Sequence, residues 1–439
     1  MFQTFKNAFK LPELRNKILF TLFIILLYRI GVAIPVPYVD ANLLGATMAS
    51  GTIFDYLNIM SGGALSQATL FALGVQPYIN ASIIIQLLTI AIPALERLSK
   101  EGEEGKKKIN TITRYVTVAL AVLTAFGYYM LLKNQYHILT NDSVFSAFVI
   151  IGCYCAGASL VMWLAERVNE HGIGNGISII LFANIIARLP AMLQSIWNTA
   201  YGWMVGGGLG ILWGVLFILA VAAVLVALVG FVVFLTESER KIPVQYAKRV
   251  VGRKMYGGQS SVLPIKLNMT GVMPIIFASS ICSLPATIMM FVSEPSGDGF
   301  GHSVYHFFET VFATTSPVYM VIYFILIIAF AYFYIAISFN PVEVANNLQK
   351  NGGSILGLRP GKPTSDYISK ILSKITLIGA IFLGFIAVLP MILGAISPTV
   401  FAGISFGGSS LLIVVGVAVE TVREIEAQMT MRHYKGFLQ

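Results

Sequence analysis

The sequence predicts an all-α polytopic membrane protein. Of its 439 residues, 56% are hydrophobic and only 11% are charged, whereas a soluble domain carries roughly 25% charged residues. The apolar residues gather in runs of about the 20 residues that a helix needs to cross a bilayer. The basic residues gather in alternate connections between these runs. Together these observations exclude a soluble globular protein.

Ten apolar runs are long enough to be membrane spans, although the fifth is short and the seventh is interrupted by Pro274 and Pro285. The predicted spans are residues 18–36, 74–93, 113–132, 146–165, 174–189, 209–235, 269–292, 318–339, 374–393 and 409–429.

The basic residues predict the orientation of these spans. Of the 29 lysines and arginines, 26 fall in one set of alternate connections and in the two tails. The long connections on the opposite side, 37–73, 293–317 and 394–408, contain no lysine or arginine. Positively charged loops stay in the cytoplasm. We therefore expect both termini to be cytoplasmic, in agreement with ten spans.

The spans divide into two halves of five, residues 1–203 and 204–439. Because each half has an odd number of spans, the two halves enter the membrane in opposite directions. Halves related in this way form an inverted repeat, and their interface holds the functional path. The sequence similarity between the halves is too weak to prove such a repeat.

An irregular stretch, residues 51–93, precedes and includes the second span. It is too apolar for a surface loop, and it is broken at Ser61, Gly62 and Gly63. Non-helical backbone at membrane depth is tolerated only inside protein or along a watery cavity. This stretch is therefore expected to form the wall, and the stopper, of a path through the protein.

Two cytoplasmic connections, 236–268 and 340–373, are longer than the topology requires. The first has β-branched and aromatic residues beside a basic run, which predicts a twisted hairpin. The second contains a predicted helix over 341–350, a turn at Gly352 and Gly353, and a tip rich in proline and glycine around Arg359. We expect these shaped loops to contact a partner.

The sequence shows no residue pattern typical of catalysis. The five histidines lie in connections or the tail, and the three cysteines have no metal-binding spacing. The glycines of HGIGNGIS, residues 171–178, do not follow a strand, so they indicate close helix packing rather than a nucleotide loop. We therefore predict no enzyme activity, no metal and no cofactor.

The interior of the spans is aliphatic rather than acidic. An ion-coupled carrier usually has ionisable residues near the midplane, but the acidic side chains here sit at span ends. Arg29 lies near the outer end of its span, where it is expected either to reach the membrane surface or to fix a neighbouring segment. Aliphatic residues near the span centres are able to close a pore by dewetting; the alternative is that they are ordinary packing residues. These residues are Val75, Ile79, Leu181, Ile276 and Ile413.

Long irregular motifs carry a resemblance that covers essentially the whole chain. They are SGGALSQATLFALGVQPYINASIIIQLL at 61–88, ERVNEHGIGNGISIILFANI at 166–185, PVQYAKR at 243–249, MTGVMPIIFASSI at 269–281, NPVEVANNLQKNGGSILGLRPG at 340–361 and FGGSSLLIVV at 406–415. In these motifs the chain resembles the SecY/Sec61-alpha family, the channel-forming subunits of protein translocons. The resemblance implies two inverted five-helix halves around a central hourglass pore.

The resemblance also implies roles for single residues. The five aliphatic residues match the pore ring, although Val75 and Leu181 depart from the commoner isoleucine. The implied plug is Thr52, Ile53, Phe54, Asp55, Tyr56, Leu57, Asn58, Ile59, Met60, Ser61, Gly62, Gly63, Ala64 and Leu65. The implied polar members of the lateral gate are Asn80, Gln86, Asn268 and Thr270. The implied docking residues for a motor or a ribosome are Lys248, Arg249, Arg253, Lys254 and Arg359.

The function implied is a protein-conducting channel that moves unfolded secretory polypeptides across the bacterial plasma (inner) membrane and releases transmembrane segments into the bilayer. The implied partners are the SecE and SecG subunits, the SecA motor ATPase, the ribosome with its RNA phosphates, signal peptides, nascent chains and membrane lipids. The alternative is a secondary transporter of a small solute, for which the spans offer no coupling-ion site.

Overall fold

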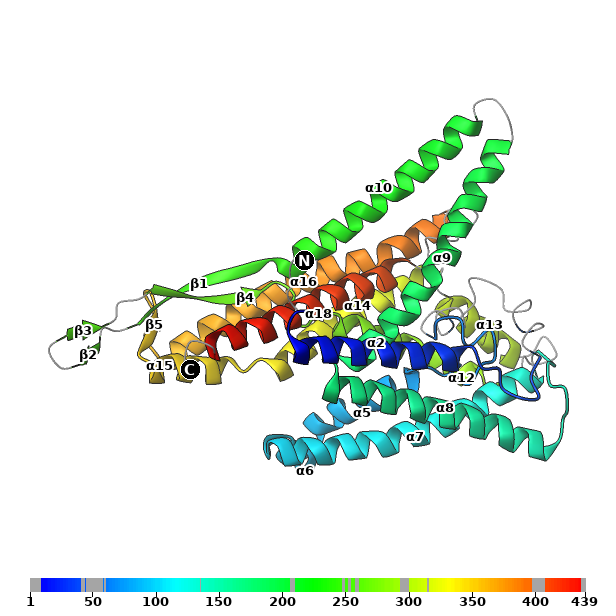
Figure 1. Cartoon of the computed structure of the whole chain (residues 1–439), viewed down its shortest axis with the longest axis horizontal. Helices are drawn as coiled ribbons and strands as arrows, with labels where there is room; N and C mark the ends of the chain where they lie inside the picture. Colours follow the sequence, from blue (N-terminus) through cyan, green and yellow to red (C-terminus); the bar gives the residue numbers. More distant parts are fainter. Residues whose placement is uncertain are drawn as a thin grey trace.

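The structure is a computed structural model, which describes residues 9–40, 44, 58, 61–134, 136–205, 210–246, 249–251, 254–256, 260–292, 300–313, 316–396 and 407–435. The described part is a bundle of long helices that lie roughly side by side, with a β-ribbon that extends from one end (Figure 1). The hairpin of α9 and α10 leans away from the bundle (Figure 1).

The helices before residue 206 are α2 (Pro12–Val32), α5 (Gln76–Ala91), α6 (Pro93–Lys100), α7 (Glu103–Asn134), α8 (Val144–His171) and α9 (Gly176–Val205). The helices that follow are α10 (Gly210–Glu237), α11 (Met273–Cys282), α12 (Leu284–Met289), α13 (Phe300–Phe312), α14 (Pro317–Ser338), α15 (Pro341–Lys350), α16 (Lys362–Ile396) and α18 (Gly407–Lys435). The strands are β1 (Glu239–Tyr246), β2 (Arg249–Val251), β3 (Lys254–Tyr256), β4 (Ser260–Lys266) and β5 (Gly353–Ile355).

Every predicted span coincides with a helix, except that the seventh is divided between α11 and α12. Within the described residues, six helical segments are long and apolar enough to cross a membrane, and α5 with α6 adds a seventh. The protein is therefore a multi-pass membrane protein, whereas the number of ten spans stays a prediction.

Prolines explain the two breaks in the helical spans. Pro285 has no N–H to donate to the preceding turn, which favours a break in the helix, and α11 ends at Cys282 with Ser283 as its C-cap. At the other break, Ile92 precedes Pro93 and is extended, as residues before proline usually are. The chain turns by 101° there, from α5 into the exposed helix α6.

The two long basic connections join in one sheet. The predicted hairpin is confirmed, because β1 pairs antiparallel with β4 from Glu239 opposite Lys266 to Gln245 opposite Ser260. The predicted helix over 341–350 is also confirmed as α15. The sequence did not predict that β5 pairs with the other edge of β1, with Val244 opposite Ile355. A small apolar core beneath the sheet reaches Ile368 of α16.

Small residues allow the helices of the first half to approach closely. A Cβ atom on Gly176, at the start of α9, would collide with the backbone of Ala165 in α8. This contact agrees with the packing role predicted for the HGIGNGIS glycines. It also fixes the start of α9, which carries Leu181, against α8.

Candidate functional site

The five predicted aliphatic residues all belong to the main hydrophobic core of the bundle, which also contains other buried residues of the same helices. They come from four helices: Val75 and Ile79 from the start of α5, Leu181 from α9, Ile276 from α11 and Ile413 from α18. Each side chain is at most 2% exposed. They share this core although they lie up to 338 positions apart in the chain, and we call these five residues the aliphatic ring.

The helices α5 and α11 present their ring residues through the same local structure. Each is preceded by a glycine with positive φ, +54° at Gly74 and +62° at Gly271, a conformation that glycine adopts without strain. A valine then serves as N-cap, with φ and ψ of −87° and −5° at Val75 and −90° and −5° at Val272. The repeat Gly-Val-x-Pro is visible in the sequence, but hydropathy and charge do not single it out.

The Gly-Val-x-Pro repeat sets the register of the ring. Ile79 and Ile276 each lie four residues after the N-cap valine, one helical turn along. Both helices begin beside the same core, which also contains the two valines. The two halves of the chain therefore contribute equivalent first turns to the ring.

Most of the implied plug lies outside the described residues. Only Asn58 and residues 61–65 of this segment are described. Asn58 and Ser61 are buried, and the Asn58 carbonyl accepts from the Gly63 N–H at 2.9 Å. The Tyr128 hydroxyl of α7 donates to the Leu65 carbonyl at 2.5 Å. The end of the segment is thus held against the bundle through hydrogen bonds, as buried irregular backbone requires.

Gly62 and Gly63 lie at the break and both have positive φ, +71° and +90°. They differ in their surroundings. A Cβ atom on Gly62 would lie 2.8 Å from Oδ1 of Asn184 in α9, whereas a Cβ atom on Gly63 would meet nothing within 4 Å. Gly62 is therefore the point of close approach between this segment and α9.

A cavity separates the end of the plug segment from the helices around it. Its volume is about 30 Å³. The wall includes Ser61 and Leu65, the ring residues Val75 and Leu181, and Thr287 of α12. The aliphatic ring, the plug segment and the seventh span therefore meet at one place.

The predicted gate residues do not form one cluster. Gln86 donates to Ser82 of its own helix at 3.4 Å. Thr270 donates to Asn268 at 3.2 Å, and both line a small cavity with residues of α14 and α16 rather than α5. Asn80 is half-buried on α5.

Other residues join the two halves where α5 and α7 face α11 and α12, a boundary we call the seam. The side-chain amide of Gln76 donates to the Ser283 hydroxyl at 2.7 Å. Further along the seam, the rings of Phe126 and Phe291 are 6.2 Å apart. The sequence offered only weak signals for these contacts: an amide in the first turn of α5 and a serine at the break of the seventh span.

Arg29 contacts a helix rather than solvent. Its guanidinium donates to the Ala183 carbonyl of α9. The adjacent residues of the two helices also bond, because the Asn184 amide donates to the Tyr28 hydroxyl at 2.9 Å. These bonds fix α2 to α9 beside Gly62. Of the two roles expected for Arg29, the structure therefore shows the one in which it holds a neighbouring segment.

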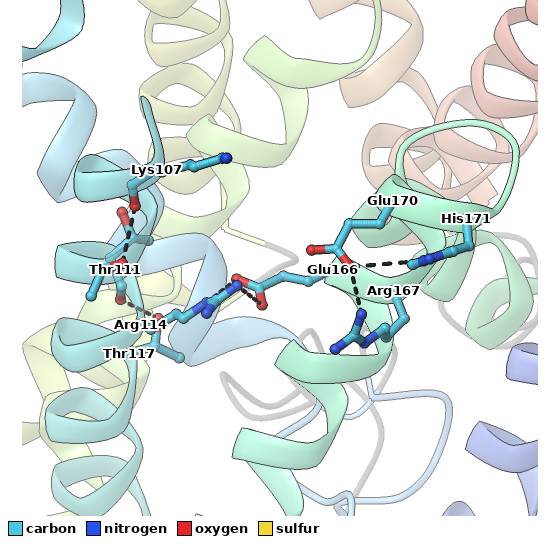
Figure 2. A network of polar contacts seen from close by, with 9 residues as sticks. Lys107, Thr111, Arg114, Thr117, Glu166, Arg167, Glu170 and His171 are labelled. Atoms are coloured by element: carbon cyan, nitrogen blue, oxygen red, sulfur yellow. Dashed lines mark hydrogen bonds and ion pairs between the residues drawn. The ribbon is translucent and has the colours of Figure 1, made fainter. Parts of the chain in front are cut away.

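An ion pair joins α7 to α8 (Figure 2). Arg114 donates through Nε and Nη2 to the two carboxylate oxygens of Glu166, both at 2.8 Å. The next residue of α8, Arg167, pairs with Glu170 one turn further along the same helix at 2.7 Å. Bidentate arginine–carboxylate pairs are geometrically specific, so this pair orients α7 relative to α8.

The predicted docking residues are only partly described. Lys248 and Arg253 lie outside the described residues, while Arg249 is in β2 and Lys254 is in β3. Arg359 is exposed, and its carbonyl accepts from the Thr364 hydroxyl at the start of α16 at 2.9 Å. Arg359 therefore stands on a turn between β5 and α16, close in sequence to the strand that binds β1.

The base of the sheet is attached to α18. Arg423 of α18 donates to the Thr236 carbonyl at the end of α10 at 3.0 Å. Burial lowers the pKa of Lys266, at the end of β4, and the nearby positive charge of Arg423 lowers it further. The sheet is thus connected to the helix that carries Ile413.

Among the described residues, no group of three or more histidine, cysteine, aspartate or glutamate side chains is arranged to hold a metal. The features that stand out are instead a bundle of apolar helices, a buried aliphatic ring, and an irregular segment packed against it. Such an arrangement is typical of a helical membrane channel.

The comparisons with known proteins agree with this class. The SecY family model matches residues 69–422. Protein translocase subunit SecY of Streptomyces scabiei is 45% identical over 455 residues, and the SecY subunit of Mycobacterium tuberculosis is 44% identical over 454 residues. Both alignments cover all of this chain and all of the relative. The chain belongs to the SecY family.

Solved structures share the fold. A structure described as that of a protein conducting channel has a TM-score of 0.62 and 19% identity, covering 94% of this chain and 92% of the other. A canine Sec61 structure from a ribosome–channel complex has a TM-score of 0.58 and 18% identity over the same shares. Family and fold together give this chain the function of a protein-conducting channel.

Proposed function

We propose that unfolded secretory polypeptides cross the plasma membrane through the aliphatic ring. The observation that supports this proposal is the complete burial of five aliphatic side chains from four helices in the core of the bundle. An aliphatic constriction excludes ions by dewetting, without binding them. It also has no directional chemistry, so it accepts any side chain that is pushed through. The two halves, 1–203 and 204–439, supply the ring as an inverted repeat, which the shared Gly-Val-x-Pro starts support.

The segment 52–65 acts as the plug that covers the ring from outside. Its described end, Ser61 to Leu65, lines the cavity next to Val75 and Leu181. The positive-φ glycines at 62 and 63 supply the bend at which the segment leaves. The asymmetric distribution of Lys and Arg supports cytoplasmic termini and a position of this segment on the opposite side.

The seam releases transmembrane segments sideways into the bilayer. Apolar helices have no hydrophobic attraction to one another in lipid, so the apolar part of the seam exchanges readily with lipid or with a signal peptide. At the bilayer centre a leucine gains about 0.3–0.6 kcal/mol and an arginine costs about 2.5–3.5 kcal/mol. An apolar stretch therefore leaves through the seam, while a polar one continues through the ring.

The energy for transport comes from partners, since a channel of this family does no chemistry of its own. The motor ATPase SecA and the ribosome dock on the cytoplasmic sheet and on the turn of Arg359, through motor carboxylates or RNA phosphates. SecE and SecG complete the complex. Relatives solved with ribosomes, canine Sec61 and yeast Ssh1, support ribosome docking.

Locking the seam tests lateral opening. Phe126 and Phe291, whose rings are 6.2 Å apart, are replaced by cysteine in a variant without the native cysteines. A short, cleavable thiol reagent then joins the two new cysteines. We expect export into vesicles to stop and to return when the reagent is cleaved. In the control, the variant carries only the cysteine at position 126, so the same reagent joins no helices. Export that continues with the bridge formed would show that the seam does not open.

Charge reversal at Arg359 tests docking. Because Arg359 is exposed and no described contact depends on its guanidinium, Arg359→Glu should leave assembly intact. We expect SecA-driven export to fall about 10-fold, which corresponds to the loss of about 1.4 kcal/mol of docking energy. The matched control is Lys370→Glu, an exposed basic position further along α16. Equal export by both variants would place docking elsewhere.

A further inference from the structure

Glu420 of α18 lies on the same helical face as the ring residue Ile413, which comes seven residues earlier in the chain. Seven residues make almost two turns of a helix and advance about 10 Å along its axis. Ile413 is buried, whereas Glu420 is exposed. Because α18 runs from the ring toward the predicted cytoplasmic tail, Glu420 lies on the cytoplasmic side of the ring.

The turn of α18 between these two residues packs tightly against the start of α11. A Cβ atom on Gly416 would lie 2.3 Å from Cγ1 of Val272, the N-cap of α11. One turn further along α18, a carboxylate oxygen of Glu420 would lie 3.8 Å from a Cβ atom on Gly271. Glu420 is therefore placed beside the start of α11, at the predicted cytoplasmic end of this helix of the seam.

The Glu420 carboxylate is available to a ligand. Three charged side chains act on it from nearby: Lys266, Arg423 and Glu424. Of these, Arg423 donates to a backbone carbonyl at the end of α10 at 3.0 Å, and Glu424 accepts from the Gln428 amide at 3.2 Å. Within the part of the chain that the structure describes, no donor forms a hydrogen bond or an ion pair with Glu420 itself. Its oxygens can therefore accept a charge-assisted hydrogen bond from a basic side chain.

We propose that Glu420 binds the basic N-terminal segment of a signal peptide while the apolar core of the peptide occupies the seam. A signal peptide begins with a positively charged segment, and an apolar run of about 7–15 residues follows. Positively charged segments stay on the cytoplasmic side, so the residues before the apolar run lie where Glu420 stands. Glu420 is thus a specificity-determining residue for basic peptides. This inference rests on the proposed function of the seam as a lateral gate.

The expected effect is modest in size but specific for charge. Exposed ion pairs change an equilibrium by up to about 5-fold. Glu420→Gln keeps the shape of the side chain and removes its charge, so the preference for a basic peptide over a neutral one should fall about 2- to 5-fold. Glu420→Lys should reverse the preference in favour of an acidic peptide. If Glu420 acted only in packing, its replacement would weaken the binding of all peptides alike.

The experiment measures peptide binding to the assembled complex in nanodiscs of zwitterionic lipid, which carry no net charge to attract basic peptides. Three fluorescent peptides share an apolar core of about 12 residues. They differ only in the three residues before this core, which are all lysine, all glutamine or all glutamate. Fluorescence anisotropy gives their dissociation constants for the wild type and both Glu420 variants. The matched control is Glu343→Gln, which removes the same charge from an exposed position in the first turn of α15.

We expect the wild type and Glu343→Gln to bind the lysine peptide most tightly, and Glu420→Gln to lose most of this preference. The glutamine peptide should bind all variants equally, and high salt should reduce the preference of the wild type. A preference that persists in Glu420→Gln, that falls as much in Glu343→Gln, or that is replaced by an equal loss for all three peptides would overturn the role of Glu420. If no peptide binds the wild type, the proposed lateral gate fails, and the role of Glu420 fails with it.

Discussion

Replacing Ile79 and Ile276 together with glycine will make the resting channel leak ions. Both side chains are 2% exposed and lie one turn into α5 and α11, at the ring. Their loss widens the constriction and lets water in, which removes the dewetting barrier. A reduction of the barrier by only about 1.4 kcal/mol raises the flux about 10-fold. We expect at least that increase in chloride efflux from vesicles that contain the complex.

The control for this leak uses the same helices. Ile83 of α5 and Ile275 of α11 are also buried, 4% and 0% exposed, but they are not ring residues. Glycine in a helix costs about 1 kcal/mol relative to alanine, so both double variants are weakened similarly. If the control leaks as much as the ring variant, the leak reflects loosened packing and the ring is not the seal.

Gly62→Ala will displace the plug segment, and Gly63→Ala will do so much less. Both glycines have positive φ, which costs an alanine roughly 1–2 kcal/mol. Only at Gly62 does the new Cβ atom also meet Asn184 at 2.8 Å, and such overpacking costs about 1–3 kcal/mol more. We expect a cysteine at Ser61 to become reactive to an external thiol reagent in Gly62→Ala.

This prediction is tested by the difference in Ser61→Cys reactivity between Gly62→Ala and Gly63→Ala. Because the backbone strain is matched, equal reactivity of Ser61→Cys in both would mean that contact with α9 does not hold the plug end. Asn184→Ala, combined with Gly62→Ala, should reduce the reactivity again, since it removes the colliding amide.

The helices could be predicted from the sequence because they depend on local signals. Hydropathy located each span, Pro285 located the break in the seventh, and Asn340 before Pro341 agreed with the start of α15. The ring residues came from family resemblance, and the structure places all five in one cluster.

The seam could not be predicted because it depends on distant partners. Gln76 and Ser283 are 207 residues apart, and neither differs locally from an ordinary helix residue. The gate role of Asn268 and Thr270 stays a prediction, and the structure shows that they bond to one another beside α14 and α16. The three-residue strand β5 is similar, because so short a segment forms a strand only through its pairing with β1.

The central claim, that polypeptide passes through the aliphatic ring, is tested by photo-crosslinking. A photoreactive amino acid is placed at Ile79, or at Leu219 on the exposed face of α10 as a control, and a secretory chain is stalled during export. We predict an adduct with the chain from Ile79 and none from Leu219. An exporting complex that gives no adduct at Ile79, while the chain labels Leu219, would contradict passage through the ring.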